Sequence, residues 1–117
     1  MSHPADLTRL RGFSDGTPEG LRALVQSFIT HTSNTVAELR AVTPSSPADI
    51  HVLSHRAAGA AGACGATLLA ELLRSVEASA RAGDLEGIEE QVAAVEIELA
   101  RVRTFLRPLL EDDAYGA

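Results

Sequence analysis

Residues 50 to 69 read IHVLSHRAAGAAGACGATLL, with glycine and alanine filling the middle of the stretch. At 3.6 residues per turn, one side of a helix collects a stripe of apolar and small residues: Ile50, Leu53, Ala57, Ala60, Ala61 and Cys64. Alanines in such a stripe let a neighbouring helix approach closely. The stretch therefore predicts a helix in the central wall of a helix bundle, and we expect Gly65 to bend or end it.

The segments on both sides of this stretch also have helical periodicity. Upstream, Thr17-Pro18-Glu19 is a helix start, with Thr as N-cap and Pro at the first helical position. Ser46-Pro47 is a second start, Gly83 is a C-cap, and Asp84 is expected to cap the last helix. The expected helices cover residues 5–11, 18–42, 47–64, 66–82 and 84–110, followed by a frayed tail at 112–117.

No segment alternates between apolar and polar residues for long enough to predict a strand. The chain has 117 residues, which is the size of one domain. The fold class that we expect is all-α, an antiparallel four-helix bundle with a short N-terminal helix, formed by a single domain over residues 1–117.

Composition argues against several classes of protein. Ten Lys and Arg against sixteen Asp and Glu give a net charge of −6, and aromatic residues make up 3%, so nucleic acid is an unfavourable partner. One cysteine, Cys64, can form neither an internal disulfide nor a thiolate metal cage, and we expect it in the core. Without an apolar stretch of membrane-spanning length or a signal sequence, we expect a cytoplasmic protein with no membrane contact.

The other face of the central helix has little side-chain bulk around one histidine. His51, Ala58, Gly59 and Gly62 all lie within about 60° of His55 on a helical wheel. Each glycine in a helix interior costs about 1 kcal/mol relative to alanine, and both fall on this face. The pattern predicts an imidazole that stands on a bare helix surface, open to close approach by another protein.

The run from Ser54 to Ala66, followed by Leu69, resembles the signature of histidine-containing phosphotransfer (HPt) domains. That signature places a phosphorylatable His four residues before one Gly and ten before another, as do His55, Gly59 and Gly65. The resemblance extends over nearly the whole chain, from a first long helix at 15–42 to the hairpin at 81–85. The chain departs from the family at Ala58, where a Lys is usual.

The resemblance implies a phosphorelay intermediate of two-component signalling. His55 would accept a phosphoryl group, through Nε2, from an aspartate of a response-regulator receiver domain and pass it to another receiver. The implied partners are receiver domains and a hybrid sensor histidine kinase, with Mg²⁺ on the receiver only and no cofactor here. We expect a monomeric phosphocarrier without turnover on its own, whose docking rim consists of His51, Arg56, Ala58, Gly59 and Gly62.

Two alternatives remain open. The absence of the usual Lys at Ala58 is compatible with an interaction module that has this fold but no phosphotransfer. His51 and His55 have the i, i+4 spacing of a metal-binding pair, but the sequence supplies no third ligand nearby, so we expect no metal. His31 has no supporting constellation and is expected on the surface.

Overall fold

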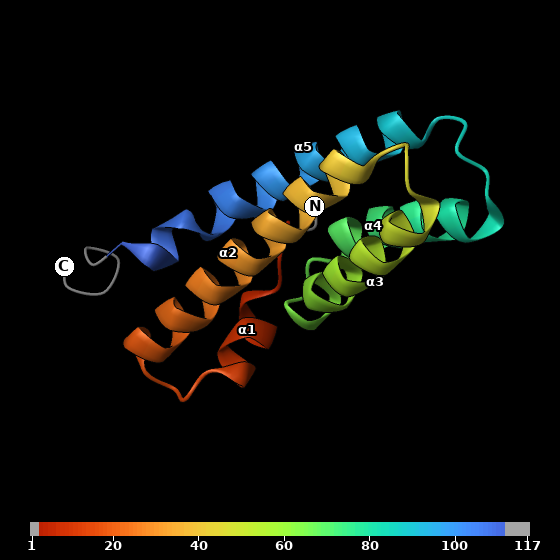
Figure 1. The fold of residues 1–117 in the computed structure, drawn as a ribbon. Coiled ribbons are helices and arrows are strands. Elements are labelled where there is room, and N and C mark those ends of the chain that lie inside the picture. Colours follow the sequence, from red (N-terminus) through yellow and green to blue (C-terminus); the bar gives the residue numbers. More distant parts are fainter. Residues whose placement is uncertain (1–2, 112–117) are drawn as a thin grey trace.

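The structure is a computed structural model that describes residues 3–111, and within this range every regular element is helical. The elements are α1 (Leu7–Phe13), α2 (Pro18–Val42), α3 (Pro47–Ala63), α4 (Thr67–Ala82), α5 (Ile88–Leu106) and a 3₁₀ turn η1 (Arg107–Leu110). Figure 1 shows α2 and α5 running side by side in opposite directions, with the α3–α4 hairpin packed beside them. This arrangement confirms the predicted all-α bundle with a short N-terminal helix.

The start of α2 follows the local signals that predicted it. Pro18 opens the helix, and the Thr17 hydroxyl accepts a hydrogen bond of 2.9 Å from the Gly20 backbone N–H. At α3, Ser46 stands at the N-cap position before Pro47 but makes no side-chain bond to the helix backbone. Its hydroxyl donates to Asp49 Oδ2 at 2.8 Å instead, so two polar side chains satisfy each other at this helix start.

The two terminal helices differ from their predicted bounds. The first helix spans 7–13 instead of 5–11, because the Asp6 side chain accepts from Arg9 N–H at 3.2 Å and sets the start there, and Gly12 continues the helix. Asp84 does not cap the last helix. Gly83 and Gly87 both have positive φ, so the chain turns twice before α5 begins at Ile88.

The last predicted helix also ends early, at Leu106, and continues to residue 110 only as the 3₁₀ turn η1. Pro108 has no backbone N–H to donate, which interrupts the α-helical hydrogen bonding. Gly65, with φ +71°, ends α3 at Ala63 and sends the chain into α4. The tail predicted to fray, 112–117, lies outside the described residues.

Aliphatic side chains from all five helices fill one continuous core. The alanine stripe of α3 contributes Ala57 and Ala61, which are both buried, and Cys64 is buried beside them, as predicted. Burial raises the pKa of the Cys64 thiol. None of the helices formed by residues 3–111 is long and apolar enough to cross a membrane.

One ion pair fastens the two long helices to each other near the end opposite α1. Arg40 of α2 donates to both carboxylate oxygens of Glu96 on α5, at 3.2 and 2.7 Å. These hydrogen bonds hold the pKa of Glu96 below its usual range. Both side chains are about two-fifths exposed, so the pair adds little stability but keeps α2 and α5 in register.

Candidate functional site

His55 stands on an open face in the middle of α3, as the helical wheel predicted. Its side chain is 74% exposed. Gly59 is exposed one turn further on, and a Cβ added there would meet no other atom within 4 Å. The imidazole is therefore accessible to a large partner along the C-terminal side of the same helix.

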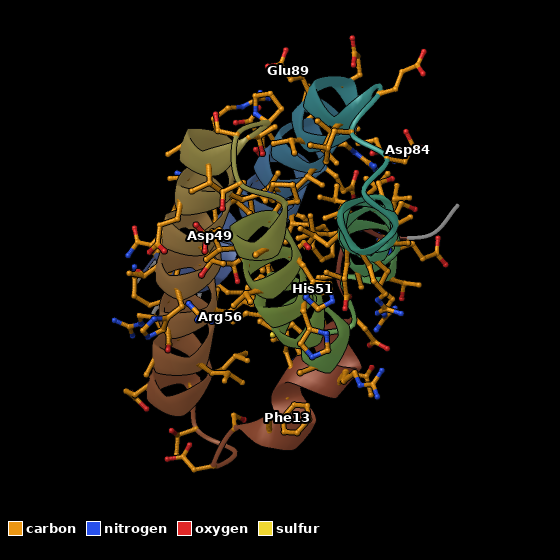
Figure 2. All side chains as sticks on the ribbon, turned by 45° about the vertical axis from the view of Figure 1, so that its right-hand side comes forward. Phe13, Asp49, His51, Arg56, Asp84 and Glu89 are labelled. Atoms are coloured by element: carbon orange, nitrogen blue, oxygen red, sulfur yellow. The ribbon has the colours of Figure 1, made fainter. Side chains whose placement is uncertain are left out.

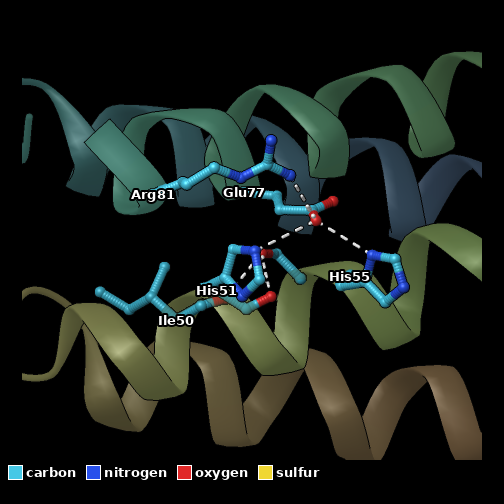
Figure 3. A network of polar contacts seen from close by, with 6 residues as sticks. Ile50, His51, His55, Glu77 and Arg81 are labelled. Atoms are coloured by element: carbon cyan, nitrogen blue, oxygen red, sulfur yellow. Dashed lines mark hydrogen bonds and ion pairs between the residues drawn. The ribbon is translucent and has the colours of Figure 1, made fainter. Parts of the chain in front are cut away.

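The structure adds a carboxylate that the helical wheel did not include. Glu77 of α4 directs Oε2 at the His55 ring, and the distance to Nδ1 is 3.0 Å. The same oxygen lies 3.4 Å from His51 Nε2 and 3.3 Å from Arg81 Nη2. Figure 3 shows these three nitrogens arranged around the one carboxylate.

The contacts of Glu77 account for its position within the core-facing side of α4. Its side chain is only 10% exposed, and a carboxylate removed from water needs hydrogen-bond donors and positive charge around it. Arg81, four residues further along α4, supplies the charge, and the two histidines supply ring nitrogens. The network joins α3 to α4 and fixes the orientation of the His55 ring.

This geometry determines which ring nitrogen of His55 is free. A neutral imidazole carries its proton on one nitrogen and a lone pair on the other. With Nδ1 directed at a carboxylate, the proton belongs on Nδ1, and the lone pair remains on Nε2. Nε2 lies on the far side of the ring from Glu77 (Figure 3), so the nitrogen with the lone pair faces away from the carboxylate.

The other predicted docking residues divide into two groups. His51 and Gly62 lie on the same face as His55, both half-buried. Ala58 does not, because it is 3% exposed: it lies far enough round α3 to join the core, so the prediction that it forms part of the rim is wrong. Arg56 is exposed but lines a hollow with Glu38 and Val42 of α2, away from Glu77.

Three residues of this region went unpredicted. Glu77 and Arg81 come from α4, and sequence periodicity does not tell which turn of one helix faces which turn of another. One signal was available, since Glu77 falls within the buried stripe of α4 together with Leu73 and Ala80. Phe13, at the end of α1, is 62% exposed and lies with His51 on the face turned toward the viewer in Figure 2.

His51 and His55, the two histidines with metal-binding spacing, both contact the carboxylate of Glu77. The rings of His51 and His55 stack with their centroids 6.4 Å apart, and each directs one nitrogen at Glu77. Among residues 3–111, no group of three or more His, Cys, Asp or Glu side chains is placed to hold a metal ion. His31 is exposed on α2, as predicted, and belongs to no such group.

Comparison with known proteins places this site in context. The family model described as the Hpt domain matches residues 23–105. The crystal structure of histidine-containing phosphotransfer protein B from Pseudomonas aeruginosa PAO1 is similar, with a TM-score of 0.82 and 22% sequence identity. The similarity covers 92% of this chain and 94% of that one, and at this identity it concerns the fold. No curated protein matches the chain.

Proposed function

Since the chain belongs to the Hpt domain family, we propose that it carries phosphoryl groups between receiver domains on His55 Nε2. The family gives a role in phosphotransfer. The observation that supports the residue and the atom is the 3.0 Å contact of His55 Nδ1 with Glu77, on a side chain otherwise open to solvent.

The chemical step needs little from this chain beyond a positioned lone pair. Nε2 attacks the phosphorus of an aspartyl phosphate on a receiver, the N–P bond forms, and the P–O bond to the aspartate breaks with its electrons leaving on the carboxylate. Nδ1 keeps its proton throughout, so the phosphorylated ring is a cation. Transfer to a second receiver is the same exchange in reverse, and phosphoryl transfer of this kind depends mainly on alignment and charge.

Glu77 has a defined task in this step. The ring becomes positively charged as the N–P bond forms, and Oε2 already lies at hydrogen-bond distance from the N–H that carries this charge. A hydrogen bond between two charged groups is stronger than one between neutral groups. Glu77 therefore favours the phosphorylated ring over the free one, and Arg81, 3.3 Å from the same oxygen, holds the carboxylate in place.

The surface around His55 suits docking of a folded domain. Gly59 leaves the backbone of α3 uncovered beside the ring, and the exposed Phe13 offers an apolar contact on the same face. Apolar anchors surrounded by polar groups are typical of protein–protein contacts. The proposed partners are receiver domains, with a hybrid sensor histidine kinase upstream, and Mg²⁺ would belong to the receiver.

The test is direct transfer. Receiver domains carrying aspartyl phosphate are mixed with the unphosphorylated chain, and the products are read by intact mass and by acid lability. The expected result is an acid-labile phosphoryl group on the chain, which a second receiver then removes. A chain that binds receivers equally well whether residue 55 is His or Gln, and never becomes phosphorylated, would instead be an interaction module.

The substitution Gly59→Leu tests the docking surface in the same assay. The new side chain meets open space, so the fold and the melting temperature are retained. It stands between the partner and the ring, however, and we expect transfer from a receiver to fall by about tenfold, the effect of losing about 1.4 kcal/mol of docking energy. Phosphorylation by a small donor such as phosphoramidate needs no docking, so it serves as the control and should fall much less, by about threefold at most. Unaltered transfer from receivers would show that the partner docks elsewhere.

Glu77→Gln removes the carboxylate charge while retaining the size of the side chain. We expect phosphorylation of His55 by phosphoramidate to slow about tenfold, because a hydrogen bond to a charged group contributes about 1.5–3 kcal/mol and a neutral amide gives up part of it. The matched control is Glu98→Gln, a buried carboxylate on α5 that pairs with Arg101 at 2.6 Å and not with a histidine. If both variants react at the wild-type rate, the Glu77 carboxylate does not contribute to phosphorylation of His55.

A further inference from the structure

The face beyond His55 has a cation at its far end, and it comes from α4. Gly62 lies two turns after His55 on α3, and a Cβ added there would lie 3.4 Å from Arg74 Nη2. The guanidinium therefore occupies the space beside Gly62 that a side chain would fill. Between His55 and this group lies Gly59, where a Cβ would meet nothing within 4 Å. The two positions of α3 that follow His55 on this face, 59 and 62, are therefore both glycine and carry no side chain.

The free nitrogen of His55 points toward this end of the face. Nδ1 is held by Glu77, and in Figure 3 Nε2 lies on the side of the ring toward which α3 continues after His55. Arg74 precedes Glu77 by three residues on α4, which runs antiparallel to α3. It is therefore displaced from Glu77 in the same direction. Nε2 and Arg74 consequently face the same bare stretch of helix.

Phosphorylation puts two negative charges on this stretch. A phosphoryl group carries about −1.5 to −2 charges near pH 7, together with three acceptor oxygens. Glu77 lies on the Nδ1 side of the ring, where it stabilises the ring cation but offers no positive charge to the phosphoryl oxygens. Arg81 is bound to Glu77 on the Nδ1 side, and Arg56 faces α2. Arg74 is exposed and makes no ion pair within the described residues, so its guanidinium is available.

We propose that Arg74 binds the phosphoryl group on His55 Nε2, its guanidinium reaching over Gly59 and Gly62 to donate to the phosphoryl oxygens. This inference rests on the proposed phosphorylation of His55. The cation that binds the phosphoryl group then comes from α4. The spacing of residues within α3 alone could not predict it. Gly59 and Gly62 then have a second role besides clearance for a partner, because a side chain at either position would stand between the arginine and the phosphoryl group.

The test uses phosphoramidate as the donor and needs no receiver, so docking does not enter. Wild type and Arg74→Gln are phosphorylated, and the phosphorus NMR shift of the phosphohistidine is followed against pH. Removal of a nearby cation makes the dianion harder to form, so the phosphoryl pKa in Arg74→Gln should be higher by about half a pH unit, the size expected of an exposed charge pair. Its rate of phosphorylation should fall about threefold. Arg74→Lys should restore most of the pKa and part of the rate, because it keeps the charge and loses the forked geometry.

Arg56→Gln is the matched control, an exposed arginine next to His55 in sequence but directed at α2. It should titrate and react as the wild type does. The assignment is overturned if Arg74→Gln has the wild-type titration curve and rate. It is also overturned if Arg56→Gln shows the same change as Arg74→Gln, because the effect would then come from the net charge of the chain and not from the position of the arginine. A wild-type chain that gains no phosphoryl group on His55 would overturn the proposed function itself. The two failures are therefore distinguishable.

Discussion

His55→Gln should abolish phosphorylation of the chain by phosphoramidate completely while leaving the melting temperature within about 2 °C of the wild type. The loss is complete because residue 55 then has no ring nitrogen to attack phosphorus, and the neighbouring His51 directs its Nε2 at Glu77. The fold is retained because the side chain is 74% exposed and contributes little to packing. Gln is preferable to Ala here, since its amide can donate to Glu77 in place of Nδ1–H and does not leave the buried carboxylate without that donor.

His51→Gln is the control for this experiment. His51 lies one turn earlier and contacts the same Glu77 oxygen, but it does so through Nε2 and is half-buried, so it shares the carboxylate with His55 and lacks the exposed Nε2. It should keep its acid-labile phosphorus signal. An undiminished signal in His55→Gln would place the phosphoacceptor on another histidine, and a signal lost equally from both variants would mean that the pair acts as a unit.

The largest effect on stability is expected at Gly65. Gly65→Ala should lower the free energy of unfolding by about 3 kcal/mol or more, measured by urea titration, and the melting temperature by about 10 °C. Two causes add. An L-residue at φ +71° is strained, and the new methyl group would overlap the Cβ of Asp6. Asp6 cannot move away freely, because its N–H bonds to Cys64 O and its side chain caps α1.

Gly83→Ala separates these two causes. Gly83 also has a positive φ, +72°, but a Cβ there would meet nothing within 4 Å. Its substitution should therefore cost only the backbone strain, about 1–2 kcal/mol. If the two alanine variants unfold at the same urea concentration, the contact of Asp6 with Gly65 contributes nothing to stability, and the docking of α1 onto this turn is loose.

The sequence was most informative where local chemistry determines the structure. The helix start at Thr17 and Pro18 and the exposure of His55 depend on neighbouring residues and on the helical repeat, and both were predicted correctly. Gly87, the second left-handed glycine of the α4–α5 turn, delays the start of α5. This was not predicted, because a single glycine does not indicate whether the helix begins before or after it.

Only the part of the site that lies on α3 was predicted from the sequence. Its α3 half follows from periodicity within one helix, whereas Glu77, Arg81 and Arg74 come from α4, whose register against α3 is set by packing. Ala58 shows the opposite error, in which the helical wheel placed on the exposed face a residue that is buried. It lies about 60° from His55, and whether such a position is open or covered depends on where the neighbouring helix packs.

The short connection between α3 and α4 has a consequence for how the site arises during folding. Only residues 64–66 separate the two helices, and every side chain assigned to phosphoryl transfer lies within 47–82. Closing so short a loop costs little chain entropy, and contacts between near neighbours in sequence form fast. The site is thus encoded by one contiguous hairpin. Insertions at the α2–α3 or α4–α5 turns would lengthen the ends of the bundle without moving Glu77 relative to His55.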